Sequence, residues 1–348
     1  MFDIKAKAQE LASMMTLEEK VSQMLYNAKA VERLGIPAYN WWNEALHGVA
    51  RAGVATVFPQ AIALAATFDE DLARRVADAV STEGRAKFNM QQEEGDRDIY
   101  KGITFWTPNI NIFRDPRWGR GHETYGEDPY LTSRLGCAFI KGLQGEDRNS
   151  LKSAACAKHF AVHSGPENDR HRFNAVVDKY DFWNTYLSAF ESAVKEAGVE
   201  VVMGAYNRVM GEPCNGSRLL LTEILRDKWG FDGHVVSDCF AIRDFHENHR
   251  VTSSPLESVT LAVKSGCDIN CGSMYALAVE AVENGLLTEA DIDTAVTRLL
   301  VTRMRLGLLG GAPAKPEYTG IGYEKVDCAE HRALNLETAR RTIVLLKN

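Results

Sequence analysis

Short apolar runs alternate along most of the chain with longer segments in which apolar residues recur at helical spacing. The short runs predict buried strands, and the longer segments predict amphipathic helices. This alternation is typical of repeated βα units around a parallel sheet. The predicted strands cover residues 36–42, 61–66, 104–112, 153–160, 199–207, 234–240 and 267–270.

Capping residues mark the starts of several predicted helices. Thr16 with Glu19, and Thr288 with Asp291, have the spacing of capping boxes or their near variants. Asp69 precedes a helix with an apolar face and is predicted to be its N-cap. The helices between the predicted strands therefore have start signals of their own.

Polar and unusual residues gather directly after the predicted strands rather than before them. In a (β/α)8 barrel the loops that follow the strands converge over one mouth, which is the catalytic face. The sequence therefore predicts an α/β fold, a (β/α)8 barrel of the TIM type, over residues 1–307. A doubly wound sheet is the alternative, but no Gly-x-Gly-x-x-Gly follows a predicted strand to support a dinucleotide site.

The C-terminal residues 308–348 differ from the barrel in character. A segment rich in glycine, alanine and proline at 310–316 predicts a linker. One helix is predicted over 328–341, and residues 343–346 then have strand character without a partner strand. We expect residues 308–348 to be a linker and the truncated start of a second domain, with the linker and the tail loose.

Composition and charge narrow the choice of partners. The chain has 348 residues, 45% of them hydrophobic, and can bury a large core. The formal net charge is -7 and lysine or arginine runs are missing, so neither nucleic acid nor an anionic membrane is an expected partner. The N-terminal segment is charged, and no run is long enough to span a bilayer. We therefore expect a cytoplasmic protein with a neutral ligand.

The seven cysteines are spread along the chain without a dense framework. Such a pattern is typical of reduced thiols in a reducing compartment. Cys267 and Cys271 are the one close pair, and their spacing is not a usual zinc pattern. We therefore predict buried thiols, no metal and no organic cofactor.

A carboxylate stands at the end of one predicted strand, in the sequence Val-Val-Ser-Asp. This residue is Asp238, and the turn-rich sequence Trp-Gly-Phe-Asp-Gly before the strand would aim it at the barrel mouth. A carboxylate in that place can attack an anomeric carbon and form a glycosyl-enzyme ester. Taken alone, Asp238 would be interpreted as the cap of the next helix, so the interpretation depends on its neighbours.

Cationic and hydrogen-bonding residues lie at neighbouring strand ends. Lys158 and His159 end the strand 153–160, and Arg170 follows in the next loop. Such donors can each hold a sugar hydroxyl, and a fixed cation near a carboxylate keeps it ionised. These residues therefore favour a site for a sugar beside Asp238.

Two more segments add candidate sugar contacts. The loop 114–129 is dense in charge, and we expect internal ion pairs to make it rigid, with Arg120 reaching the sugar. In Trp-Trp-Asn-Glu-Ala-Leu-His-Gly, Glu44 follows two tryptophans, whose rings can stack on a sugar while the carboxylate accepts from its hydroxyls. We expect one of the two tryptophans to be buried in the core. Tyr206 supplies a further polar group after a strand.

These motifs, in this order, resemble the N-terminal barrel of glycoside hydrolase family 3, from about Thr16 onwards. The resemblance rests on Trp-Trp-Asn-Glu-Ala-Leu-His-Gly, Asp-Pro-Arg-Trp-Gly-Arg-Gly, Lys-His-Phe and Val-Val-Ser-Asp. It implies a retaining β-glycoside hydrolase in which Asp238 is the nucleophile. The residues that it implies as sugar ligands at the cleavage subsite are Glu44, Arg120, Lys158, His159, Arg170 and Tyr206.

The resemblance also bears on the substrate. The Trp-Trp-x-Glu form is more similar to the β-xylosidase branch of that family than to the β-glucosidase branch. This implies release of a terminal β-D-xylosyl residue from an oligosaccharide or glycoside, with a β-D-glucosyl residue as the other choice.

The second carboxyl group that retaining hydrolysis needs as acid/base is not evident in the sequence. In multidomain members, the resemblance implies a glutamate from a second, α/β sandwich domain. The single-domain branch, which cleaves N-acetylhexosaminides, uses an Asp-x-His dyad, and Asp169 and His171 stand at a matching distance from Lys158. The same loop also contains Gly-Pro-Glu, which resembles the xylosidase pattern, so the dyad is the lesser alternative.

Two other functions stay open. One is a weakly active or non-catalytic sugar-binding barrel that needs a partner, either a missing C-terminal domain or another copy of the chain. The other is a metal-dependent hydrolase, which is less favoured because the histidines and carboxylates lack ligand spacing. Turnover of an unactivated glycoside would separate an enzyme from a sugar-binding barrel.

Overall fold

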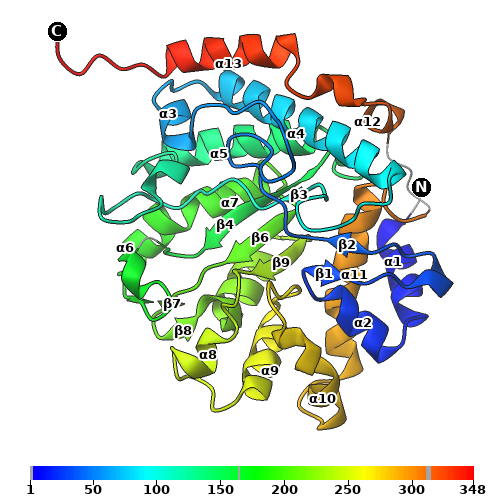
Figure 1. Cartoon of the computed structure of the whole chain (residues 1–348). Coiled ribbons are helices and arrows are strands. Elements are labelled where there is room, and N and C mark those ends of the chain that lie inside the picture. Colours follow the sequence, from blue (N-terminus) through cyan, green and yellow to red (C-terminus); the bar gives the residue numbers. More distant parts are fainter. Residues whose placement is uncertain (1–2, 164, 311–314) are drawn as a thin grey trace.

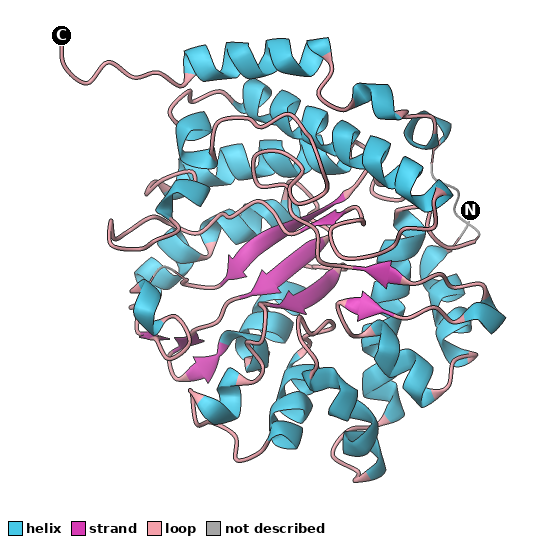
Figure 2. Ribbon diagram, viewed as in Figure 1, coloured by secondary structure: helices cyan, strands magenta, loops and turns pink. Residues whose placement is uncertain are grey.

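The computed structural model describes residues 3–163, 165–310 and 315–348, in which helices surround a central sheet (Figure 1; Figure 2). Parallel strands form the middle of that sheet in the order β3–β4–β6–β9. Their bounds are β3 Thr104–Phe105, β4 Ala154–Phe160, β6 Val201–Gly204 and β9 His234–Ser237. These strands agree with the predicted runs and are shorter than predicted.

Isolated bridges and one antiparallel pair continue the sheet beyond both of its edges. At the β9 edge, Val236 pairs with Ile269, and the next residue along, Asn270, pairs with Leu25. At the β3 edge, Phe105 pairs with the segment after β2, and β2 (Tyr39–Asn40) pairs antiparallel with β1 (Asn27–Ala28). The ring therefore closes through the N-terminal segment, and the predicted barrel is confirmed with one antiparallel step.

Helices cover the outside of the ring. The predicted capping boxes at Thr16 and Thr288 are formed, and Asp69 accepts from the backbone N–H of Leu72 at the start of α4. The remaining bounds are α1 Ile4–Ser13, α2 Leu17–Gln23, α3 Ala61–Ala65, α4 Glu70–Glu93, α5 Pro129–Gln144, β5 Asn174–Ala175, α6 Lys179–Asp181, α7 Ser188–Lys195, β7 Arg208–Val209, β8 Glu212–Pro213, α8 Asp244–Glu247, α9 Pro255–Ser265, α10 Ala278–Glu283, α11 Glu289–Arg305, α12 Pro316–Thr319 and α13 Ala329–Arg341. No described helix is long and apolar enough to cross a bilayer.

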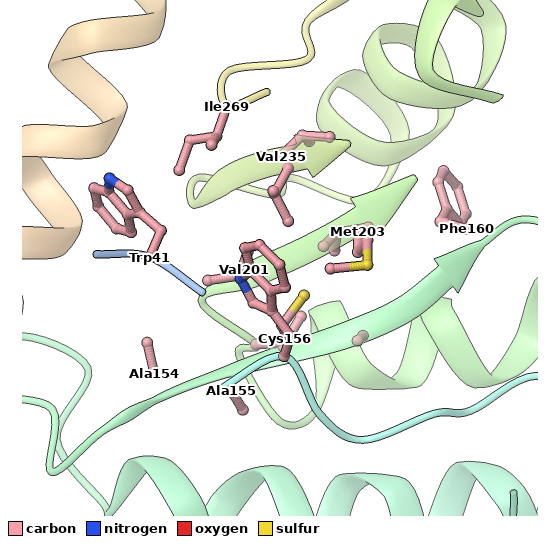
Figure 3. Close-up of a cluster of buried hydrophobic side chains, with 14 of the residues drawn as sticks. Trp41, Ala154, Ala155, Cys156, Phe160, Val201, Met203, Val235 and Ile269 are labelled. Atoms are coloured by element: carbon pink, nitrogen blue, oxygen red, sulfur yellow. The ribbon is translucent and has the colours of Figure 1, made fainter. Parts of the chain in front are cut away.

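Side chains from β4, β6 and β9, with Trp41 and Ile269, form a cluster inside the ring (Figure 3). The residues of β4 in this core include Ala154, Ala155, Cys156, Ala157 and Phe160, all fully buried. The labelled members of this core are Trp41, Ala154, Ala155, Cys156, Phe160, Val201, Met203, Val235 and Ile269.

Trp41→Ala is expected to lower the free energy of unfolding by about 3–5 kcal/mol, because Trp41 is 1% exposed and its loss leaves a large cavity. Urea denaturation followed by circular dichroism measures the change. Tyr180→Ala is the matched control, since Tyr180 is 73% exposed and its loss should cost no more than about 0.5 kcal/mol. Equal effects of the two substitutions would contradict the place of Trp41 in the core.

One predicted strand is wrong. Residues 61–66 form a helix, α3, with the sequence Ala-Ile-Ala-Leu-Ala. Alanine has the highest helix propensity, and a short apolar run has no periodicity that could separate a strand from a buried helical turn. The high alanine content was therefore the better signal.

The C-terminal segment packs on the barrel through α12 and α13. Figure 1 shows α13, the predicted helix, lying along α4, with which it shares the ion pair Arg75–Glu337. Tyr318 is buried, and Asn89 on α4 donates to the carbonyl oxygens of Tyr318 and Ile321. The predicted looseness is therefore wrong for this stretch, because these contacts tie it to α4.

The tail and the middle of the predicted linker have other outcomes. Residues 343–346 have strand character in the sequence but form no strand, and their side chains are exposed. Residues 311–314 of the predicted linker lie outside the described residues.

The prediction of reduced thiols is wrong for two cysteines, because Cys239 and Cys271 form a disulfide. Cys239 follows β9, and Cys271 follows the segment that pairs with β9 through the Val236–Ile269 bridge. Adjacent strands therefore bring together two cysteines that are 32 residues apart in the sequence. The close spacing in the sequence relates Cys271 to Cys267, but Cys267 is a buried free thiol.

Candidate active site

The predicted site residues meet at the carboxyl end of the sheet. Lys158 and His159 lie at the end of β4, Tyr206 follows β6 and Asp238 follows β9. The pairing of β4 with β6 is irregular between Lys158 and Phe160. Such an irregularity changes the direction of neighbouring side chains. Here the charge of Lys158 lies close enough to lower the pKa of Asp238, and the ring of His159 approaches the carboxylate directly.

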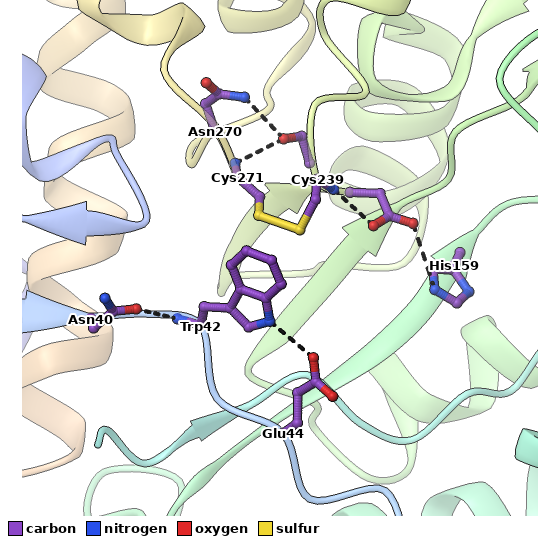
Figure 4. Close-up of a disulfide and its surroundings, with 9 residues drawn as sticks. Asn40, Trp42, Glu44, His159, Cys239, Asn270 and Cys271 are labelled. Carbon is purple, nitrogen blue, oxygen red and sulfur yellow. Dashed lines mark hydrogen bonds and ion pairs between the residues drawn. A yellow bond between two sulfur atoms is a disulfide. The ribbon is translucent and has the colours of Figure 1, made fainter. Parts of the chain in front are cut away.

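Asp238 presents one bonded and one free carboxylate oxygen. Oδ1 accepts from the backbone N–H of Cys239 at 2.8 Å. Oδ2 is buried, has no hydrogen-bond partner in the described part of the chain, and lies 3.7 Å from Nε2 of His159 (Figure 4). A desolvated carboxylate oxygen without a donor keeps its electron pairs available, so Oδ2 is the atom that can attack.

Burial raises the pKa of Asp238 above its usual value. The Arg120 guanidinium, the Cys239 N–H, the Lys158 amine and the Tyr206 hydroxyl each lower the pKa, but together they offset the desolvation only in part. The expected cations do lie near Asp238 and favour its charged form, while the opposing effect of burial could not be known from the sequence.

His159 is held as a neutral imidazole of one tautomer. Its Nε2 is 3.1 Å from Nη1 of Arg120, and its Nδ1 is 3.0 Å from Oδ1 of Asn111. An arginine can only donate, so Nε2 accepts and the proton is on Nδ1. Burial, followed by the charge of Arg120, holds the pKa of His159 well below its usual value. In this geometry both ring nitrogens are used, and His159 orients Arg120.

Arg120 is fixed by a carboxylate that the sequence analysis did not single out. Its Nε and Nη2 donate to the two oxygens of Glu123, both at 2.7 Å. Burial alone would lower the pKa of Arg120, but Glu123 raises it overall. The predicted internal pairing of this loop is confirmed, also by Arg117 with Asp115. The i,i+3 spacing of Arg120 and Glu123 was the signal available in the sequence.

Lys158 is partly buried among carboxylates. Burial, followed by Arg120, lowers its pKa, while Glu123, Glu44 and Asp238 favour its charged form. A buried ammonium group is costly unless anions or a ligand surround it. Lys158 therefore has the carboxylate neighbours that its position requires.

Glu44 and Trp42 form one wall of the site. Trp42 donates from Nε1 to Oε1 of Glu44 at 2.9 Å and stacks on Trp106 with ring centroids 5.6 Å apart. Figure 4 shows the indole between Glu44 and the disulfide that follows Asp238. Trp41 is the buried one of the pair, as expected, and Trp42 is the one at the site.

Arg170 and Tyr206 lie against each other. The guanidinium of Arg170 is 5.2 Å from the centre of the Tyr206 ring, and its Nη1 donates to Glu167 at 2.8 Å. Tyr206 is buried, which raises the pKa of its hydroxyl, and the nearby charge of Asp238 raises it further. The hydroxyl therefore stays protonated as a donor.

The structure does not bring Asp169 and His171 together as partners. Asp169 pairs with Arg172 at 3.2 Å on the exposed side of the loop. His171 bonds through Nδ1 to Oδ2 of Asp244 at 2.8 Å. Asp244 is a buried residue at the start of α8 that the sequence analysis missed, since nothing local connects it to His171.

Known proteins are similar to this chain over nearly its whole length. The family model described as the glycosyl hydrolase family 3 N terminal domain matches residues 4–302. A xylan 1,4-beta-xylosidase of Xylanibacter ruminicola is 49% identical over 99% of this chain and 40% of that protein. A beta-xylosidase/alpha-L-arabinofuranosidase of Medicago sativa is 41% identical over 99% of the chain and 46% of the relative. The chain spans less than half the length of these relatives.

Two solved structures are similar in fold. A GH3 exo-beta-xylosidase, XlnD, in complex with a xylobiose aziridine probe has a TM-score of 0.91 and 33% identity, covering 99% of this chain and 46% of that one. A beta-glucosidase from Listeria innocua in complex with isofagomine has a TM-score of 0.84 and 28% identity, covering 99% and 52%. The chain therefore belongs to glycosyl hydrolase family 3.

Proposed function

We propose that this chain is the nucleophile-bearing barrel of a retaining β-glycosidase. The observation that carries the proposal is the free, buried Oδ2 of Asp238 at the carboxyl end of the sheet, with Lys158 and Arg120 close enough to favour its charge. Attack of Oδ2 on the anomeric carbon forms the ester and breaks the glycosidic bond. The leaving oxygen needs a proton, and water then cleaves the ester and returns the carboxylate.

The proposed sugar contacts follow from the chemistry of the remaining groups. Glu44 accepts from a hydroxyl, while Lys158 and Arg170 donate to others. Arg120 and His159 are bonded to each other, so they act as one unit at the subsite. A neutral sugar with many hydroxyls suits such a mixture of donors and acceptors.

A terminal β-D-xylosyl residue is the proposed substrate group, with β-D-glucosyl as the second choice. Several relatives that are 40% identical or more carry the word xylosidase in their names. The likeness is also higher to the solved exo-beta-xylosidase than to the beta-glucosidases. The Trp-Trp-x-Glu motif, with Trp42 bonded to Glu44, supports the same choice.

A second domain is proposed to supply the acid/base. Two carboxylates near Asp238 are paired with cations: Glu123 pairs with Arg120, which lowers the pKa of Glu123, and Glu167 pairs with Arg170, while Glu44 accepts from Trp42. A general acid needs a raised pKa instead. We propose residues 1–307 as the barrel and 308–348 as the lead into that domain. A sugar-binding barrel without turnover is the competing proposal.

Mechanism-based labelling tests the proposed function. Incubation with an aryl 2-deoxy-2-fluoro-β-xyloside is expected to add one sugar to Asp238, because the fluorine slows both steps while the activated leaving group restores the rate of the first, so the ester accumulates. Peptide mass mapping locates the ester. The corresponding glucoside should label more slowly. Label on another residue would overturn the assignment of Asp238, and no label with sugar still bound would favour the competing proposal.

The rate should also depend on the ionisation of Asp238. Since the nucleophile is the carboxylate, kcat/KM should fall as the pH decreases. Because burial raises the pKa of Asp238, the midpoint of this fall should lie above the usual carboxyl pKa of 3.8. Arg120→Gln should move this acid limb to higher pH, because Arg120 lowers the pKa. The measurement is the pH profile on an aryl β-xyloside, with circular dichroism at each pH as the control for folding. An acid limb below 3.8 would contradict the direction of the shift.

A further inference from the structure

His171 joins two charged side chains that come from different parts of the site. Its Nδ1 is 2.8 Å from Oδ2 of Asp244, and its Nε2 is 3.3 Å from Nε of Arg170. Nε of an arginine can only donate, so Nε2 of His171 accepts. The proton is therefore on Nδ1 and is donated to Asp244, which fixes the tautomer.

Asp244 is a rigid anchor for this histidine. It is 2% exposed, and it also accepts from the side-chain amide of Asn248. A buried carboxylate is costly unless donors surround it, so the hydrogen bond from His171 is a large part of the stabilisation that Asp244 receives. The side chain of His171 is 42% exposed and lies on the surface of the site wall.

Arg170 is held on three sides. Nε donates to His171, Nη1 donates to Glu167, and the guanidinium lies over the ring of Tyr206. The His171 ring also packs on Tyr206, with centroids 4.5 Å apart. Within the described residues, Nη2 of Arg170 has no hydrogen-bond partner, so its N–H groups stay available for a ligand.

We propose that Asp244 and His171 are positioning residues for Arg170. Asp244 fixes the His171 tautomer so that the acceptor nitrogen faces Arg170, and Arg170 then presents Nη2 to a hydroxyl of the bound sugar. This inference depends on the proposed function in one respect, which is that Arg170 binds the sugar.

The same contact connects two sides of the site. Arg170 and His171 lie in the loop after β4, whereas Asp244 begins α8, shortly after Asp238 on the segment that follows β9. One imidazole therefore holds the sugar-binding loop at a fixed distance from the nucleophile segment. A sugar held by Arg170 then has a defined place relative to Asp238, which is the condition for efficient attack.

Two substitutions of His171 separate its hydrogen bonds from its packing. His171→Phe keeps a ring against Tyr206 and removes both hydrogen bonds. His171→Gln can donate from its amide nitrogen to Asp244 and accept at its amide oxygen from Arg170. Asp244→Asn keeps the shape of the anchor and removes its charge, and serves as a second variant should the phenylalanine disturb folding.

His171→Phe is expected to raise KM for nitrophenyl β-xyloside, and the Kd of xylose by calorimetry, by about ten- to a hundredfold, because Arg170 is no longer held toward the sugar and its charged hydrogen bond to a hydroxyl is lost. The change in kcat should be smaller than the change in KM. His171→Gln should recover most of the affinity, and Asp244→Asn should fall between the two. The control is Arg172→Gln, which breaks the exposed pair with Asp169 on the same loop and should leave affinity unchanged.

A double-mutant cycle with Arg170 decides whether His171 acts through it. If it does, Arg170→Met combined with His171→Phe should bind xylose no more weakly than Arg170→Met alone. Additive losses, an unchanged Kd in His171→Phe, or no recovery in His171→Gln would each overturn the inference while leaving the proposed function intact. An unchanged Kd in Arg170→Met would overturn both the inference and the sugar-binding role of Arg170. Failed labelling of Asp238, in contrast, concerns the proposed function alone.

Discussion

Replacing Asp238 by asparagine is expected to reduce kcat/KM on an aryl β-xyloside by on the order of ten thousandfold or more, as the loss of a nucleophile does in other enzymes. The amide still accepts from the Cys239 N–H through its oxygen but cannot attack the anomeric carbon. Binding of xylose should change far less than the rate. Stopped assays on nitrophenyl β-xyloside, with calorimetry for the binding, measure the two quantities.

The matched control is Asp227→Asn, an exposed aspartate on the helical turn before β9. It should keep full activity and stability. A complementary variant, Asp238→Gly, leaves space in which azide can approach the anomeric carbon from the nucleophile's side. It should convert an activated β-xyloside into the α-xylosyl azide. Retained hydrolysis in both variants would remove Asp238 from the mechanism.

The second large effect concerns the leaving group. The isolated chain is expected to cleave nitrophenyl β-xyloside about a hundred to ten thousand times faster than xylobiose, because general acid assistance contributes this much when the leaving group is too basic to depart unaided. The second step should also be slow without a base to activate water, so a burst of nitrophenol should precede a low steady rate. Stopped-flow absorbance and product analysis measure both.

Azide gives this prediction a control of its own. It needs no base, so it should accelerate the steady rate of the unmodified chain and yield the β-xylosyl azide by attack on the α-linked ester. The configuration of the azide therefore separates this result from that of Asp238→Gly. Efficient cleavage of xylobiose without any response to azide would mean that an acid/base lies within this chain, and Asp169→Ala with His171→Ala would then test the loop dyad.

The elements of the barrel could largely be predicted from the sequence, since they depend on interactions between near neighbours. The apolar runs specify β4, β6 and β9 because a buried strand needs little more than a short apolar stretch between turns. Caps such as Thr16 with Glu19 work over a single turn. The error at 61–66 arose because a short apolar run has no periodicity that separates a strand from a buried helical turn.

The candidate nucleophile could be predicted for a related reason. Parallel strands in one ring have their carboxyl ends on the same face, so residues after β4, β6 and β9 had to meet once the barrel was inferred. Lys158, Tyr206 and Asp238 are brought together in this way. The motif resemblance then supplied the order of the roles, which the folded chain itself does not label.

Tertiary structure alone decided the contacts between distant segments and the charge states that follow from them. The Cys239–Cys271 disulfide and the His171–Asp244 pair each join residues that no local pattern relates, and they form because neighbouring strand ends converge. The raised pKa of Asp238 depends on how deeply the whole fold buries one carboxylate, which outweighs the nearby cations. The sequence thus determined the elements and the residues at their ends, while packing determined which of those residues touch and which are charged.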